Sequence, residues 1–232
     1  MTRLAWAEQR LGHHFGNAAL LEQALTHRSA SKSNNERLEF LGDSLLNFVI
    51  ARRLYEQRPD DAEGDLSRLR AYLVRGTSLA VVALELGLEQ QLIVGPGELR
   101  AGGARRETVL ANGLEALIGA VLLDGGYVAA EACVDRLFRA RLAGLPDAAS
   151  LKDAKTRLQE WLQARGRVLP EYTVESTAGE PHEKTFTVVC SVSPDGPISR
   201  GCGSSRRKAE QDAAEKLLTA LIEVDAECFP PQ

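Results

Sequence analysis

Three acidic side chains lie three and four residues apart in one short stretch of the chain: Glu36, Glu39 and Asp43. Apolar residues recur through the same stretch at helical spacing, from Leu38 to Val49, which predicts an amphipathic helix. At this spacing the carboxylates share one helix face, where like charges repel by roughly 0.2–0.5 kcal/mol per pair. A solvated acidic face is the simplest interpretation. Clustered carboxylates beside packed surface are also what a hard divalent cation such as Mg²⁺ requires.

Two features favour a cation site over a solvated surface. The acidic residues run beside Phe40, Leu41 and Leu45, so they are expected at the edge of packed surface. Gly42 interrupts the helix, and glycine costs about 1 kcal/mol relative to alanine in a helix interior. That cost is explained if another group must approach the backbone closely at this point.

A second polar pair lies far away in the sequence, on a helix predicted over residues 105–123. Asn112 and Glu115 are three residues apart, so they share a face of that helix. A lone Asn/Glu pair on a helix is usually part of a solvated surface. The pair contributes to a site only if its helix faces the acidic helix.

A basic cluster near the C-terminus is typical of a phosphate-binding turn. Arg206, Arg207 and Lys208 follow two closely spaced glycines, in the first turn of a predicted helix. Cations there oppose the helix dipole, yet the same turn presents free backbone N–H groups that suit a phosphate. We therefore favour a phosphate contact over a solvated basic turn. Arg105 and Arg106 form a second, smaller basic cluster.

Composition narrows the class of partner. The 232 residues carry a formal net charge of −4, with 44% hydrophobic and 26% charged residues, which are ordinary globular values. This net negative charge argues weakly against a nucleic-acid partner, but the distribution of the charged residues along the chain matters more than their sum. Because only 5% of residues are aromatic, stacking platforms for single-stranded bases are scarce. A duplex that is recognised through its backbone fits better.

The sequence also bears on the cellular location of the protein and on whether it binds zinc. No uninterrupted apolar run approaches the roughly 18 residues of a membrane span, and no signal-type stretch follows Met1. We therefore expect a cytoplasmic protein without a membrane partner. The four cysteines form no CxxC pair and no His/Cys cluster, so a zinc site is not expected.

Hydrophobic periodicity divides the chain into two parts. Residues 1–143 are predicted to be entirely helical, with a flexible loop over 99–104, a helix beginning after Thr77 or Ser78, and a cap at Asn34 or Asn35. A breaker-rich linker follows. The second part has the order α-β-β-β-α, with strands expected near residues 171–176, 184–192 and 197–202. Its last helix is expected to end near Ile222, followed by a disordered tail.

The stretch from Glu36 to Ser44, Glu-Arg-Leu-Glu-Phe-Leu-Gly-Asp-Ser, closely resembles the signature motif of ribonuclease III. Residues 153–222, with Gly-x-Gly-x-Ser-Arg-Arg-Lys-Ala-Glu before the last helix, resemble that family's double-stranded-RNA-binding domain. The resemblance implies an all-α nuclease domain over 1–144, a linker over 145–152, a small α+β RNA-binding domain over 153–222 and a tail over 223–232.

The resemblance also implies an activity. A member of this family is a homodimeric endoribonuclease that depends on Mg²⁺, with Mn²⁺ as a substitute, and cuts both strands of double-stranded RNA. The products carry 5′-phosphate and 3′-hydroxyl ends, and processing of ribosomal and other structured RNAs, including messenger RNA, is the expected role. An RNA-binding domain of this type spans about 16 bp and recognises mostly shape and 2′-hydroxyl groups.

By position, the resemblance assigns roles to particular residues. The metal site comprises Glu39, Asp43, Asn112 and Glu115, with Asp43 and Glu115 as the catalytic residues. Phe40 is the apolar plug of the dimer interface. Contacts to RNA, or support of the active-site network in the case of Glu36, fall to the following residues: Glu36, Gln159, Gln163, His182, Arg206, Arg207 and Lys208.

One residue departs from the family pattern. Family members commonly carry Asp at the position of Asn112. Asn keeps a carbonyl oxygen that can ligate a metal but removes one negative charge, so we expect activity with a raised Mg²⁺ requirement. Two alternatives stay open: a non-catalytic regulator that binds double-stranded RNA, and a helical protein-interaction scaffold. The scaffold predicts no salt-dependent RNA affinity.

Overall fold

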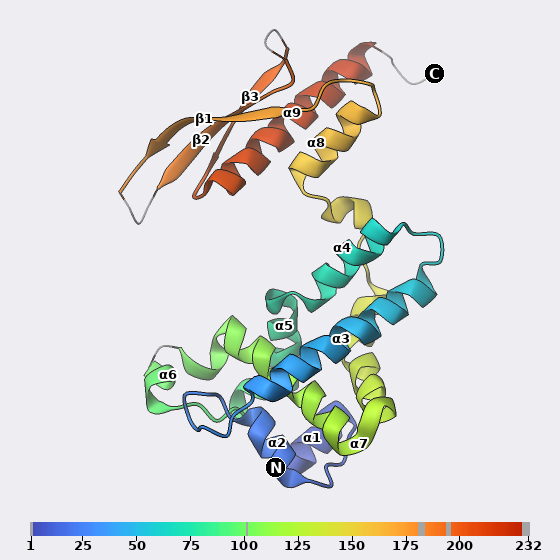
Figure 1. The fold of residues 1–232 in the computed structure, drawn as a ribbon, viewed down its shortest axis with the longest axis vertical. Coiled ribbons are helices and arrows are strands. Elements are labelled where there is room, and N and C mark those ends of the chain that lie inside the picture. Colours follow the sequence, from blue (N-terminus) through green and yellow to red (C-terminus); the bar gives the residue numbers. More distant parts are fainter. Residues whose placement is uncertain (1, 101, 181–183, 194–195, 229–232) are drawn as a thin grey trace. The chain divides into compact units, whose positions relative to one another are not determined.

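The computed structural model describes residues 2–100, 102–180, 184–193 and 196–228, which form two compact units, Met1–Leu151 and Lys152–Gln232 (Figure 1). The boundary falls within the predicted linker, where a short 3₁₀ turn covers Ala148–Leu151. The first unit is helical and the second combines helices with a sheet, so the predicted fold class, an all-α domain followed by a small α+β domain, is confirmed.

The helices of the first unit are α1 (Arg3–Leu11), α2 (Ala18–Leu25), α3 (Glu36–Gln57), α4 (Glu63–Val74), α5 (Gly76–Leu86), α6 (Pro96–Arg100) and α7 (Glu107–Ala143). The acidic stretch begins α3, where the Asn34 side chain accepts a hydrogen bond from the backbone N–H of Glu36. Asn35 makes no such side-chain bond. Of the two residues proposed as the cap, Asn34 is therefore the one whose side chain bonds to the start of α3.

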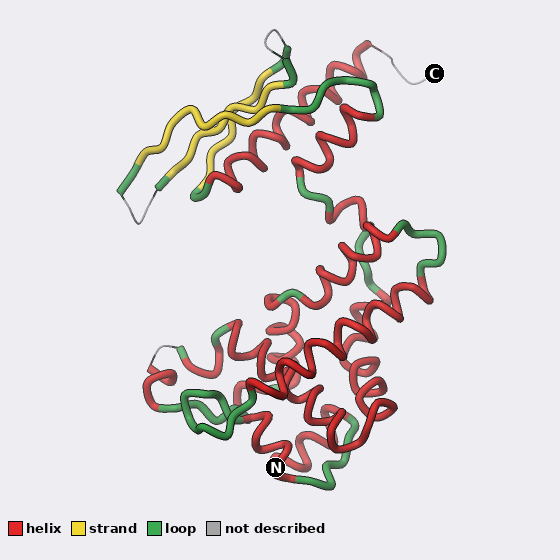
Figure 2. The backbone as a smooth tube through the Cα atoms, in the orientation of Figure 1, coloured by secondary structure: helices red, strands yellow, loops and turns green. Residues whose placement is uncertain are grey.

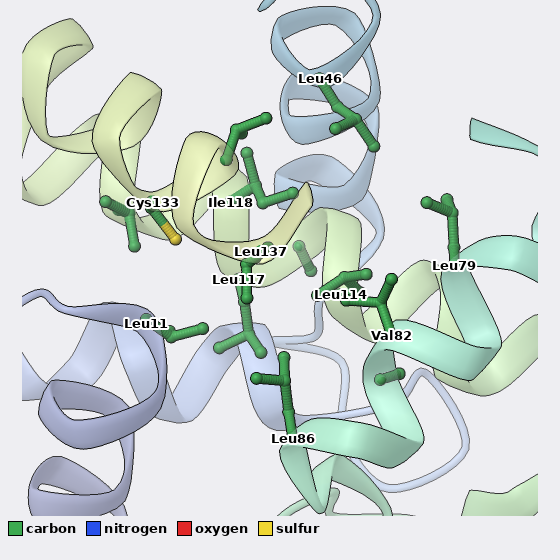
Figure 3. Close-up of a cluster of buried hydrophobic side chains, with 14 of the residues drawn as sticks. Leu11, Leu46, Leu79, Val82, Leu86, Leu114, Leu117, Ile118, Cys133 and Leu137 are labelled. Atoms are coloured by element: carbon green, nitrogen blue, oxygen red, sulfur yellow. The ribbon is translucent and has the colours of Figure 1, made fainter. Parts of the chain in front are cut away.

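Helix α7 lies at the centre of the first unit. Its apolar side chains contact those of α1, α3 and α5 in a cluster that includes Leu11, Leu46, Val82 and Leu114 (Figure 3). At Gly126 the backbone takes φ +77°, a left-handed conformation that suits glycine, and the helix kinks there. The helix expected over residues 105–123 is therefore the first segment of α7, which continues beyond the kink.

By length and composition alone, α7 is long and apolar enough to cross a membrane. No uninterrupted apolar run of that length is visible in the sequence, because Asn112, Glu115 and Asp124 interrupt it. A helix enclosed by other helices is apolar on most of its faces. The packing of α7 in the core accounts for its composition.

Two local predictions in the first unit were wrong. Helix α5 begins at Gly76 rather than after Thr77 or Ser78, and neither residue caps it. Residues 99–104 were expected to form a loop, yet α6 covers Pro96–Arg100 and a 3₁₀ turn covers Gly103–Arg105. Elements this short have too few residues to show a hydrophobic period.

The second unit contains α8 (Ala154–Gln163), β1 (Glu171–Ala178), β2 (Thr185–Ser191), β3 (Ile198–Gly203) and α9 (Arg206–Cys228). The strands form an antiparallel sheet in the order β1-β2-β3 (Figure 2). Gly201 allows α9 to lie directly on β3, because a Cβ there would meet the backbone nitrogen of Ala213 at 2.2 Å. Helix α9 extends to Cys228, beyond the end expected near Ile222.

Candidate functional site

The acidic residues of α3 and the polar pair of α7 come together where the two helices cross. A Cβ at Gly42 would lie 1.8 Å from the carbonyl oxygen of Glu115, and a Cβ at Gly119 would lie 2.2 Å from that of Leu38. Two glycines therefore let the helix backbones touch. The group that approaches Gly42 closely is the backbone of the helix that carries Asn112 and Glu115.

The electrostatics of the crossing show that its carboxylates act on one another. Burial raises the pKa of Glu115 to about 7, and the negative charges of Asp43 and Glu39 add to that shift. Burial also raises the pKa of Glu39, against a hydrogen bond from the Asn112 side chain that lowers it. Asp43 is exposed. The site thus concentrates more negative charge than its surroundings stabilise.

The donor set at the crossing fits a hard divalent cation. It offers three carboxylates and one amide carbonyl, which are oxygen ligands of the type that Mg²⁺ prefers. Within the described part of the chain, no three Asp, Glu, His or Cys side chains are gathered closely enough to form a finished metal-binding group. Side-chain rotation would be needed to bring Glu39, Asp43 and Glu115 onto one ion, whose charge would relieve their repulsion.

A cavity of about 410 Å³ opens beside this crossing, and Glu39 and Asn112 form part of its wall. Glu36 also lines it, where its Oε1 lies 3.3 Å from Nη1 of Arg28. Burial keeps the pKa of Glu39 raised, and the charge of Arg28 offsets only part of that rise. Of the predicted residues, Glu36 thus lies in the same cavity wall as Glu39, and its charge adds to the effect of burial in raising the pKa of Glu39.

Phe40 lies four residues after Glu36 and three before Asp43, so it borders the acidic face of α3, and its ring is 76% exposed. Phe48 and Tyr55 follow it at spacings of eight and seven residues, so the three rings form an aromatic stripe along one side of the helix. Both of these rings are also exposed. Exposed aromatic surface of this extent on a helix face is typical of a protein interface.

The predicted RNA-binding residues of the second unit fall on two helices. Gln159 and Gln163 are exposed on α8, and Arg206, Arg207 and Lys208 are exposed in the first turn of α9. A cavity of about 640 Å³ brings Gln159 together with Arg206 and Arg207. His182 lies outside the described residues.

A polar cluster that was not predicted from the sequence lies beneath this surface. Glu210 is buried and forms ion pairs with Arg206 at 2.8 Å and with Lys155 at 2.6 Å. The ammonium of Lys155 also lies over the ring of Tyr172, 4.1 Å from its centroid. The spacing of four residues between Arg206 and Glu210 was visible in the sequence, whereas the contacts of Lys155 depend on how α8, β1 and α9 pack.

Comparison with known proteins identifies similar sequences over both units. A family described as Ribonuclease-III-like matches residues 17–142, and one described as a double-stranded RNA binding motif matches residues 154–221. A protein of Nitrosococcus oceani named Ribonuclease 3 is 54% identical over 216 residues, which cover 92% of this chain and 93% of that protein. One of Shewanella amazonensis with the same name is 53% identical over 211 residues, 91% of this chain and 93% of that protein.

Solved structures resemble the first unit. The nuclease domain of ribonuclease III from Campylobacter jejuni, in a crystal structure at 2.2 Å resolution, aligns with a TM-score of 0.59 and 40% sequence identity. The alignment covers 63% of this chain and all of that one. A second structure of that domain, described for flexibility in its dimer-forming region, aligns with a TM-score of 0.57 and 42% identity over 59% of this chain and 96% of the other.

Proposed function

Since the chain belongs to the ribonuclease III family, we propose that it is an endoribonuclease that cleaves both strands of double-stranded RNA with the help of Mg²⁺. The observation that carries this proposal is the crossing of α3 and α7, which places Glu115 within the field of Asp43 and Glu39. The double-stranded RNA binding motif of the second unit supports a duplex substrate.

The proposed chemistry is hydrolysis of a phosphodiester. Glu39, Asp43 and Glu115 would hold the cation, and Asn112 would contribute its carbonyl oxygen or orient a water through its amide. Bound Mg²⁺ supplies Lewis acidity, which lowers the pKa of the attacking water and neutralises the scissile phosphate. Glu115 must be ionised for this role, although burial holds its pKa at about 7 without a cation. The products carry 5′-phosphate and 3′-hydroxyl ends.

The second unit supplies affinity rather than chemistry. Gln159 and Gln163 on α8 contact the RNA minor groove, and Arg206, Arg207 and Lys208 contact phosphates. We further propose that two copies pair through the aromatic stripe, with Phe40 as an apolar plug. Cytoplasmic location and a role in processing ribosomal or messenger RNA remain sequence-based predictions.

Glu115→Gln tests the proposed function, because it removes a carboxylate charge from the site and changes the volume of the side chain very little. We expect cleavage of a long perfect RNA duplex to fall by at least ~100-fold, since metal-ion catalysis contributes several kcal/mol. Binding of the same duplex, measured by gel shift, should be retained. Cleavage at the wild-type rate would refute the site assignment.

The regulator hypothesis is kept because Asn112 replaces the usual Asp. It predicts that the unmodified chain binds duplex RNA tightly and yields no product at any Mg²⁺ concentration. The cleavage and binding measurements on the wild-type chain therefore separate the enzyme from the regulator.

A further inference from the structure

The cavity beside the candidate active site contains two arginines that the proposed mechanism does not use. Arg28 lies in the connection between α2 and α3, and Arg106 immediately precedes α7. Both line the cavity of about 410 Å³ that Glu39 and Asn112 also line. Arg106 belongs to the smaller basic cluster of the sequence, to which no function has yet been attached.

Each arginine is paired but remains accessible. Nη1 of Arg28 lies 3.3 Å from Oε1 of Glu36, and Nη1 of Arg106 lies 2.8 Å from Oε1 of Glu98. The Arg28 side chain is 69% exposed and that of Arg106 is 51% exposed. Within the described part of the chain, neither guanidinium makes another side-chain hydrogen bond, so most of its five donors are available.

The negative charge of the cavity wall indicates where an RNA strand needs these hydrogen-bond donors. Its wall carries Glu36, Glu39 and Glu98, with the remaining carboxylates of the crossing close by. A cation at the crossing neutralises the scissile phosphate alone, whereas the adjoining phosphates of an RNA strand are also anionic and would be repelled. The planar fork of arginine matches a phosphate group and binds it through two parallel hydrogen bonds.

We propose that Arg28 and Arg106 are phosphate-binding residues of the cavity, which hold the RNA backbone on the two sides of the cleaved bond. In the RNA-free protein Glu36 and Glu98 hold the two guanidinium groups in place, and RNA phosphates replace these carboxylates on binding. The inference rests on the proposed function, which it extends from the cleaved phosphate to its neighbours.

The test compares Arg28→Ala and Arg106→Ala with Arg37→Ala and Arg105→Ala. The two controls remove the same charge from exposed arginines next to the cavity that do not line it. All four are made in the full chain with Glu115→Gln, and the RNA is checked for integrity after each measurement. Affinity for a perfect duplex is measured over a series of KCl concentrations.

Arg28→Ala and Arg106→Ala should each weaken binding ~10-fold at low salt, as loss of a charged hydrogen bond does. Each should also reduce the slope of log K against log salt by about 0.9, the value for one phosphate contact. The controls should leave the slope unchanged. Equal losses in all four variants, or an unchanged slope in the first two, would overturn the proposal.

Glu98→Gln separates a phosphate contact from a structural ion pair. It breaks the pair with Arg106 but keeps the arginine, so affinity should equal or exceed that of the parent. If Glu98→Gln weakens binding as much as Arg106→Ala, the ion pair matters and the proposed contact is wrong. Absence of cleavage by the wild-type chain refutes the proposed function instead, whatever the arginine variants show.

Discussion

Among single residues, the proposed chemistry depends most on Glu115, whose carboxylate is half-buried near two others. Burial and the charges of Asp43 and Glu39 raise its pKa from 4.5 to about 7. Its ionised form therefore costs free energy in the metal-free protein. A bound cation would reverse that cost, which couples metal binding to release of a proton from Glu115.

This environment predicts a pH dependence of stability. Because the pKa of Glu115 is higher in the folded state, its contribution to stability is lost as pH rises from 4.5 through about 7. Without metal, Glu115→Gln should therefore stabilise the first unit relative to wild type at pH 8, by roughly 1–2 kcal/mol after solvent screening, and much less at pH 5. Calorimetric melting in EDTA at both pH values measures this, and a difference that does not change with pH would contradict it.

The types and spacing of the acidic residues were readable from the sequence, as was their suitability for a cation. The position of Arg28 and Arg106 at the cavity was not readable from the sequence. Neither has a partner at helical spacing, and each reaches the cavity from a connection before a helix. Side chains on such connections acquire their role only when the helices around them are packed.

At the scale of elements, the site exists because α3 and α7 touch at two glycines. Helical periodicity predicted both helices, and Gly42 indicated a close approach to the backbone. The sequence left open which segment approaches, since Gly119 lies 77 residues further on and carries no local signal of its partner. The crossing is a property of the packed core.

Gly42→Ala should therefore be strongly destabilising. Its Cβ would meet the backbone of Glu115 at 1.8 Å, which no rotamer change can relieve. We expect a loss of about 3 kcal/mol or more in the free energy of unfolding, the upper range for overpacking. Thermal or denaturant unfolding followed by circular dichroism measures it.

Gly97→Ala is the matched control, because a Cβ at Gly97 in α6 meets nothing within 4 Å. It should change stability by less than about 1 kcal/mol. Similar losses for the two alanine variants would mean that the close contact between α3 and α7 is not what Gly42 provides.

At the scale of the whole molecule, the order of two units was predictable because each carries its own motif and its own hydrophobic period. The helix-rich first unit and the α-β-β-β-α order of the second follow from composition and periodicity. The extension of α9 to Cys228 did not. Its last turns include an ion pair of 2.7 Å between Asp225 and Arg165, a contact between distant segments.

The aromatic stripe predicts how two copies of the chain associate. Phe40→Glu places a charge at the 76% exposed ring, so it should convert a dimer to a monomer at micromolar concentration. Sedimentation velocity of the wild-type chain and the variant measures this. Val81→Glu, at another exposed apolar side chain on α5, should leave the dimer intact. A dimer that survives Phe40→Glu, or a wild-type monomer, would contradict the proposed interface.

We propose that residues of α3 and α7 together bind Mg²⁺ and use it to cut duplex RNA. The most direct test of this claim is cleavage of one long perfect duplex across a Mg²⁺ titration, by the wild-type chain and by Asn112→Asp. We expect no product without the metal, cleavage by both proteins with it, and half-maximal cleavage by Asn112→Asp at a lower Mg²⁺ concentration, because one more carboxylate faces the ion. Tight binding of the duplex with no product from the wild-type chain at any Mg²⁺ concentration would contradict the claim.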